Sequence, residues 1–180
     1  MRAQSEFGLW WREHGTGGGC AVITLAQARW PESEVDSVPT LAGFVESSFS
    51  PLVAEVARRC LSQATVHERT AVIIVSCSGD VTTAVATAQA VDAGTRLGPL
   101  LFFQAVPNAV AGYIAAIWNL TGPVVCLSPA SPESQDGLEL ADLLIRDGDA
   151  DQALIISVEQ AMTEGERDSA VAVLVKGEQP

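Results

Sequence analysis

Leu100 to Ser131, LLFFQAVPNAVAGYIAAIWNLTGPVVCLSPAS, is the stretch around which the chain is organised. It opens with an apolar run, for which we predict a strand over Leu100 to Val106. An alanine-rich helix is expected from Ala109 to Trp118, the turn at Asn119 to Pro123 ends it, and a second apolar strand runs to Ser128. Two apolar strands around an apolar helix, within roughly thirty residues, are typical of the centre of an α/β domain.

The flanking segments continue this alternation of strands and helices. A helix is expected to begin at Ser50, a residue type that caps helices, followed by Pro51 at the first helical position. The predicted strands are Cys20 to Ala26, Ala71 to Val75, Ala153 to Val158 and Ala170 to Val175, and the predicted helices are Ser50 to Gln63, Val81 to Asp92 and Glu133 to Arg146. We therefore expect an α/β fold whose mixed, mainly parallel sheet carries helices on its faces. The domain is expected over residues 19–180, after a poorly patterned lead-in over residues 1–18.

Composition restricts the classes of function. The chain has 180 residues, 48% of them hydrophobic, and a net charge of −12. The negative charge argues against binding to nucleic acid or to an anionic membrane surface. The four cysteines stand singly and the two histidines are far apart, so no metal-binding spacing is present. The first residues lack the apolar run of a signal peptide. A cytoplasmic protein with reduced thiols is the expectation.

The central stretch also carries a family resemblance. An apolar segment, then VPNAVAGY (Val106 to Tyr113), a helix, the LTGP turn and a strand follow one another. This order resembles the N-terminal half of β-ketoacyl synthases, which have the thiolase fold, over about Gly19 to Gly177. The resemblance is nearest to short ketosynthase and chain-length-factor-like proteins of type II polyketide and aryl-polyene pathways. It implies half of a thiolase-like fold, no cofactor of its own, and a substrate carried on the phosphopantetheine of an acyl carrier protein.

The resemblance also bears on condensation chemistry. In the family, the nucleophilic cysteine lies a few residues past a Gly-Pro pair, and counting from Gly122-Pro123 places Ser131 at that position. A serine hydroxyl needs a general base to act as a nucleophile. The family's two catalytic histidines come from its C-terminal half, and neither His14 nor His67 matches them. The resemblance thus implies that condensation does not occur. We interpret Ser131 as a helix cap before Pro132, with residual serine-based acyl transfer as the alternative.

Cys77 is the candidate catalytic residue. It lies in the turn Ser76-Cys77-Ser78-Gly79-Asp80, where the resemblance places a gate residue near the acyl pocket. A helix is expected to begin just after it, and a helix N-terminus favours a thiolate. By resemblance, such a thiolate would add reversibly to a conjugated acyl thioester and permit cis/trans isomerisation of a double bond. The alternative is that Cys77 merely fills space in a tight turn.

Other polar or small side chains are candidates for the substrate pocket. Asp80 is either a favourable charge at a helix start or an acid near Cys77. Gln104 needs a hydrogen-bonding partner if it is buried, from a partner subunit or from a ligand. Asn108 either holds a turn or lines the pocket. Cys126 lies on the strand that the resemblance places at the dimer axis, and it either packs in the core or an interface or lines the pocket. The full set of candidates is Ser76, Ser78, Asp80, Gln104, Asn108, Cys126 and Ser131.

Two functions remain open at this point, and a plain acyl-chain binding module differs from the second only in its ligand. One is a non-condensing ketosynthase-like enzyme, a cis/trans isomerase of carrier-bound unsaturated acyl chains. The other is a catalytically silent, chain-length-factor-like subunit that dimerises with itself or with a true ketosynthase. Half of the fold would leave an apolar helix such as Ala109 to Trp118 without its usual cover, so a dimer is expected in either case. Contact with an acidic carrier protein would have to use Arg58, Arg59 and Arg69.

Overall fold

The computed structural model describes residues 22–132 and 134–178. The lead-in over residues 1–18 and Cys20 lie outside the described residues. The strands are β1 (Val22–Trp30), β2 (Thr70–Val75), β3 (Val124–Leu127), β4 (Gln152–Glu159) and β5 (Ser169–Gly177). The helices are α2 (Phe49–Leu61), α3 (Val81–Asp92), α4 (Pro99–Gln104), α5 (Pro107–Trp118) and α6 (Asp136–Arg146).

The strands form one sheet in the order β1-β5-β4-β2-β3. β2 runs parallel to both of its neighbours, β3 and β4, whereas β5 runs antiparallel to β4 and to β1. The sheet is therefore mixed, as expected, but parallel pairings do not outnumber antiparallel ones. The first and the last strand of the described chain, β1 and β5, pair with each other. β1 lies at one edge of the sheet and β3 at the other.

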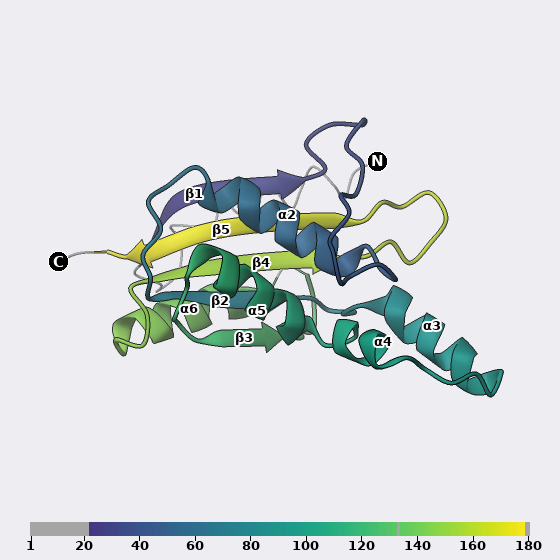
Figure 1. Ribbon diagram of the computed structural model, residues 1–180. Coiled ribbons are helices and arrows are strands. Elements are labelled where there is room, and N and C mark those ends of the chain that lie inside the picture. Colours follow the sequence, from purple (N-terminus) through teal and green to yellow (C-terminus); the bar gives the residue numbers. More distant parts are fainter. Residues whose placement is uncertain (1–21, 133, 179–180) are drawn as a thin grey trace.

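Helices cover both faces of this sheet (Figure 1). α2 and α5 pack on one face, against a core that includes Val72, Ile74 and Leu154. α6 packs on the other face, against Ile73 and Ile155. Every residue of β2 is buried. This agrees with its uninterrupted apolar sequence, which is typical of a strand covered on both sides.

α2 shows how the sequence pattern produces this packing. Its apolar residues recur at helical spacing, and one stripe of them, including Leu52 and Val56, is fully buried. Cys60 lies in the same stripe with no exposed surface, which confirms the prediction of a core thiol. Burial raises the pKa of this thiol to about 11. The helix begins at Phe49, so Ser48 and not Ser50 occupies the N-cap position.

The predicted strand over Leu100 to Val106 is wrong, because this segment is the short helix α4 followed by a turn. Gly98 precedes the helix and Pro99 occupies its first turn, a combination that favours a helix start. The run from Leu100 to Gln104 also lacks the β-branched residues that favour strands. A short apolar run does not distinguish a strand from a helix by periodicity alone.

α3 and α4 differ from the other helices in their position. Figure 1 shows both of them extending beyond the end of the sheet rather than lying on a face of it. Of the residues of α3, only Thr83 is buried. The bounds of α3 are those predicted, Val81–Asp92.

Candidate functional site

The topology points to one end of the sheet as the place for a site. After β2 the chain passes to the face covered by α5, and after β3 it passes to the opposite face, covered by α6. The carboxyl ends of two neighbouring parallel strands whose connections leave on opposite sides form a crevice that commonly binds ligands. The residues at this switch point are Cys77, two residues after β2, and Ser128, directly after β3. They touch, since the Ser128 hydroxyl donates a hydrogen bond to the Cys77 carbonyl oxygen at 3.2 Å.

A carboxylate from the third parallel strand holds this turn. Glu159, at the end of β4, accepts a hydrogen bond from the Cys77 peptide N–H at 2.6 Å and from the Ser78 hydroxyl at 2.7 Å. The Ser76 hydroxyl donates to the same carboxylate at 3.5 Å, and it accepts from the Gly79 N–H at 2.9 Å. Gly79 has a positive φ of 67°, which glycine adopts at little cost. Three predicted residues, Ser76, Cys77 and Ser78, are thus brought together around Glu159.

The structure shows Asp80 in the first of its two predicted roles, a favourable charge at the start of a helix. It is the N-cap of α3, and its carboxylate accepts from the Thr83 N–H at 3.0 Å and from the Thr83 hydroxyl at 2.8 Å. It also accepts from the Ser47 hydroxyl at 2.6 Å. The Thr82 N–H in the first turn donates to the Gln160 side chain at 3.1 Å. The backbone N–H groups of Thr82 and Thr83, in the first turn of α3, therefore bind the side chains of Gln160 and Asp80 and not that of Cys77.

Asn108 and Cys126 form a second group, on the outer part of the sheet. The Cys126 thiol, on β3, donates to the Asn108 side-chain oxygen at 2.9 Å, at the start of α5. The cysteine residue is exposed overall, yet desolvation of its sulfur raises the pKa of the thiol. Cys126 is therefore not a core residue, which corrects the prediction of core packing, while packing at an interface stays a prediction. Among the described strands β3 pairs with β2 alone, so its other edge is open.

Gln104 stands apart from both groups. It is the last residue of α4 and only 4% exposed, and neither atom of its side-chain amide has a hydrogen-bond partner within the described residues. The expectation that a buried Gln104 needs a partner is therefore unmet among the residues that the structure describes. Phe103, beside it, packs on Phe44 of the loop before α2, with ring centroids 5.9 Å apart.

Ser131 does not cap the following helix, so that interpretation is wrong. α6 begins at Asp136, and its N-cap is Gln135. A separate turn intervenes, in which the Ser134 N–H donates to the Ser131 carbonyl oxygen at 3.1 Å.

The three arginines considered for carrier-protein contact are already paired with carboxylates. Arg58 and Arg59 both bind Glu55, and Arg59 also binds Asp36 at 3.1 Å. Hydrogen bonding from Arg58, together with that from Arg59, lowers the pKa of Glu55. Arg69 lies 3.6 Å from Asp151. A free basic patch made of these three residues is therefore not present.

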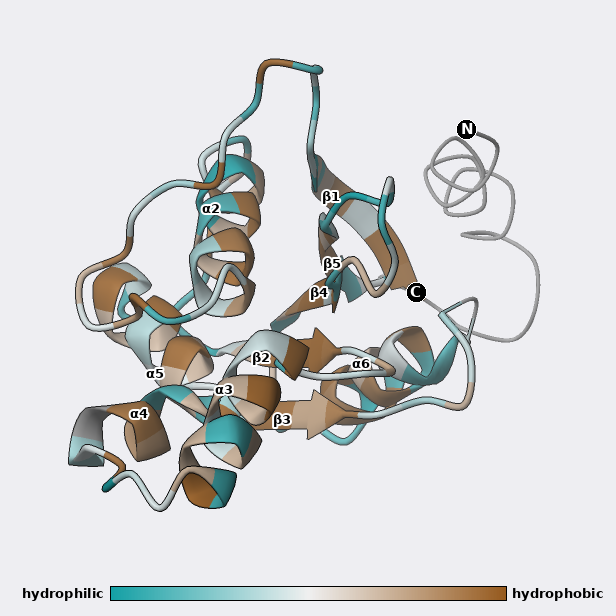
Figure 2. Ribbon diagram, turned by 90° about the vertical axis from the view of Figure 1, so that its right-hand side faces the viewer, coloured by the Kyte–Doolittle hydropathy of each residue, from teal (hydrophilic) through white to brown (hydrophobic). Residues whose placement is uncertain are grey.

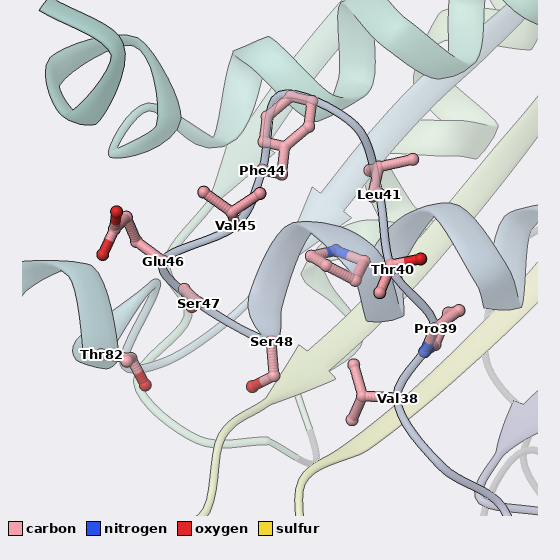
Figure 3. Close-up of a pocket in the computed structure, with 11 residues that line it drawn as sticks. Val38, Pro39, Thr40, Leu41, Phe44, Val45, Glu46, Ser47, Ser48 and Thr82 are labelled. Carbon is pink, nitrogen blue, oxygen red and sulfur yellow. The ribbon is translucent and has the colours of Figure 1, made fainter.

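Two hollows lie on the α2 side of the molecule. The larger, of about 380 Å³, is lined by the loop before α2, including Phe44 and Glu46, and by Thr82 of α3 (Figure 3). The smaller, of about 220 Å³, lies between α2 and α5 and is lined in part by Tyr113 and Trp118. Cys77 lines neither of them.

The part of the chain that the structure describes also lacks two other features. No three of its His, Cys, Asp and Glu residues are grouped so that they could hold a metal ion. None of its helices has the length and apolar character needed to cross a membrane.

Sequence reasoning missed Glu159, Ser128 and Gln160, and a signal for the first two was present. Both stand at the carboxyl ends of predicted strands next to the one that precedes Cys77. Polar residues at those ends of parallel strands meet at one edge of a sheet. Gln160 follows directly and binds Ser47 at 3.0 Å, a contact across more than a hundred residues that no local pattern reveals.

Comparisons with known structures agree on the fold. The chain is similar to a chain of the ketosynthase (ApeO) in complex with its chain length factor (ApeC) from Xenorhabdus doucetiae, at 16% identity and a TM-score of 0.72, over 88% of this chain and 80% of that one. It is similar to the ishigamide ketosynthase/chain length factor at 17% identity and a TM-score of 0.65, over 81% of this chain and 48% of that one.

A third similar structure is a type II PKS acyl-carrier protein in complex with its ketosynthase (AntDE:AntF), at 13% identity and a TM-score of 0.69, over 89% of this chain and 63% of that one. The chain thus spans about half to two thirds of two of these proteins, and most of the first. A search of curated proteins found no match.

These likenesses establish the fold, which is about half of a thiolase-like ketosynthase fold, as expected. The family model described as "Beta-ketoacyl synthase, N-terminal domain" matches residues 23–167, which is most of the chain and includes all of the candidate residues above. The chain therefore belongs to the family of β-ketoacyl synthase N-terminal domains.

Proposed function

We propose that this chain is a non-condensing, chain-length-factor-like subunit of a type II polyketide or polyene pathway, and that it pairs with a condensing ketosynthase. The observation that carries the proposal is a surface almost without charge. Between Val81 and Pro132 only Asp92 and Arg96 are charged, although the whole chain has 32 charged residues, 22 acidic and 10 basic. We call the exposed residues of α3, α4 and β3 the low-charge surface.

The low-charge surface has the composition of an interface. Phe102 is 79% exposed, and Phe103, Val85 and Val91 are at least about half exposed. Figure 2 shows hydrophobic residues on both α3 and α4. Large exposed apolar patches mark interaction sites, and interfaces are depleted of charge and enriched in aromatic residues at their centre. The open edge of β3, next to this patch, offers unpaired backbone groups for an added strand.

The absence of condensation is supported by Ser131. By the count from Gly122-Pro123 it stands where the resemblance places the nucleophilic cysteine, and a serine hydroxyl is a poor nucleophile unless a base activates it. Pairing with a ketosynthase is supported by the solved relatives, since two of the similar structures are described as ketosynthases with chain length factors. In the first of them the matched chain is of comparable length to this one, because a similar share of each chain is covered.

The carrier protein is expected to dock mainly on the partner. The chain has a net charge of −12, and Arg58, Arg59 and Arg69 already bind carboxylates of the chain itself. Acyl carrier proteins are acidic, so like charge disfavours their contact with this subunit.

The test is co-expression with the condensing ketosynthase encoded in the same gene cluster, followed by light scattering of the purified complex. We expect a heterodimer that Phe102→Lys disrupts. The matched control is Val35→Lys, which also places a lysine at an exposed apolar side chain (89% exposed) but lies in the loop after β1, outside the low-charge surface. A wild-type chain that stays monomeric, or one that forms only homodimers, would contradict the proposal.

A second candidate function is cis/trans isomerisation at Cys77, favoured by the position of this residue at the switch point of the sheet. The thiol loses its proton to solvent, and the thiolate adds to the β-carbon of a conjugated acyl thioester while the π electrons move to the thioester oxygen. Rotation follows about the former double bond. The enolate then expels the thiolate, which restores the double bond with no net gain or loss of atoms or electrons.

The isomerase hypothesis is tested with Cys77→Ala and with Cys126→Ala as the matched control, in the assembled complex. Double-bond geometry of a carrier-bound polyenoyl chain is followed by chromatography. The hypothesis predicts that Cys77→Ala abolishes isomerisation while Cys126→Ala retains it. Equal rates for both variants would leave only the subunit function.

A further inference from the structure

The buried amide of Gln104 has no assigned role in the low-charge surface. We propose that Gln104 is a specificity-determining residue for the ketosynthase partner, and that its amide acquires its hydrogen bonds only in the complex. This inference rests on the proposed function, since it concerns the same surface. It goes beyond that function because it names one polar contact that selects the partner, in a surface otherwise recognised through apolar contact.

The local structure places this amide just beneath the surface. Gln104 is buried, yet the residues on either side of it, Phe103 and Ala105, are exposed, and so is Phe102, two residues before it. α4 is only six residues long and is joined to α5 by a two-residue connection. Its aromatic contact with Phe44 is made by Phe103. The proposal requires that this short helix rotate far enough to bring the amide to the interface.

The unpaired amide is informative because burying it without partners costs free energy. A primary amide carries two donors and an acceptor with two lone pairs, and burying it without partners is unfavourable. Among the described residues only Trp30 shares this condition, through its indole N–H, and Trp30 lies on β1 at the far edge of the sheet. Of these two residues, only Gln104 therefore lies in the stretch from Val81 to Pro132 that is almost free of charge.

Such an arrangement gives selectivity as well as affinity. Apolar surfaces fit many partners of similar shape, whereas a buried polar group rejects any partner that leaves it unpaired. The partner's complementary group is expected to be uncharged, a backbone peptide or a side-chain amide or hydroxyl, because the surface around Gln104 offers no counter-charge within α4 or α5.

The experiment compares the isolated chain with the complex. Gln104→Met and Gln104→Leu replace the amide by an apolar side chain of similar size, and Gln27→Met, on β1, is the matched control. The thermal midpoint of each isolated variant and its Kd for the cluster's own ketosynthase are measured. We expect the Gln104 variants to be as stable as wild type or more stable when isolated, yet to bind roughly tenfold more weakly or worse. The Gln27 variant should bind as wild type does.

The outcomes separate this inference from the function on which it rests. No complex with the wild-type chain overturns the proposed function. A wild-type complex that the Gln104 variants form equally well overturns the Gln104 inference alone. Lowered stability of both isolated Gln104 variants also overturns it, since the amide would then be paired within the chain, for example through a bound water.

Discussion

Glu159 is the residue that fixes the geometry around Cys77. Its carboxylate receives hydrogen bonds from three consecutive residues, Ser76, Cys77 and Ser78, and so ties the turn after β2 to the end of β4. Hydrogen bonds to a charged acceptor are stronger than neutral ones. The backbone of Cys77 is thus held by a carboxylate more than eighty residues away in the sequence.

Removing this carboxylate should loosen the turn. We expect Glu159→Ala to lower the free energy of unfolding by about 1–3 kcal/mol, because the buried Ser76 and the half-buried Cys77 lose their acceptor. Urea unfolding measures the loss, and faster hydrogen exchange of the Cys77 amide locates it. Glu164→Ala, in the exposed turn between β4 and β5, is the control and should leave both quantities unchanged.

Cys60 predicts a pH dependence of stability. The folded chain holds the proton of this buried thiol up to a pKa of about 11, whereas the unfolded chain releases it near pH 8.5, about the ordinary value. Above that pH the unfolded state binds fewer protons, so stability is fully present below about pH 8.5 and falls as pH rises toward 11. The slope contributed by one proton approaches about 1.4 kcal/mol per pH unit.

The measurement is urea unfolding at several values of pH between 8 and 11. In Cys60→Ala the difference in slope from wild type should correspond to one proton, so the stability that the variant lacks at pH 8 shrinks as the pH rises toward 11. Identical slopes for the two proteins would contradict the assignment.

At the scale of elements, α6 is bound closely to the sheet through Gly137. A Cβ on this residue would lie 2.9 Å from Val75 Cγ2 and 3.0 Å from Ile155 Cγ2. We expect Gly137→Ala to cost about 1–3 kcal/mol through overpacking, less the gain in helix propensity. Gly112 of α5 has no atom within 4 Å of the corresponding Cβ position, so Gly112→Ala should be neutral or stabilising by up to about 1 kcal/mol. Denaturant unfolding measures the change in the free energy of unfolding in each variant. Equal changes in the two variants would show that α6 has room to shift.

The elements also show how far sequence reasoning reaches. Helix α3 and strands β2, β4 and β5 were predicted within one or two residues, because their apolar patterns and turn residues agree. α4 was misread because a short, mainly apolar run fits either a strand or a helix. The turn after β2 was predicted, but its link to Glu159 was not, since hydrogen bonds between distant segments leave no periodic trace. Family resemblance supplied the importance of Cys77 and Ser131, which composition alone does not reveal.

At the scale of the molecule, the two sides of the structure differ in charge. α6 has charged residues on its outer side, among them Glu139 and Arg146, which are ordinary for a face in water. α3 and α4 together have a single charged residue, Asp92, and expose several large apolar side chains. A subunit that meets its partner on one side only is expected to show this asymmetry.

Hydrogen–deuterium exchange of the chain, alone and bound to the ketosynthase of its gene cluster, tests this account most directly. We predict that the amides of α3, α4 and the open edge of β3 exchange more slowly in the complex, while those of α6 keep the rates of the isolated chain. Slower exchange confined to α6, or no change anywhere on the low-charge surface, would contradict it.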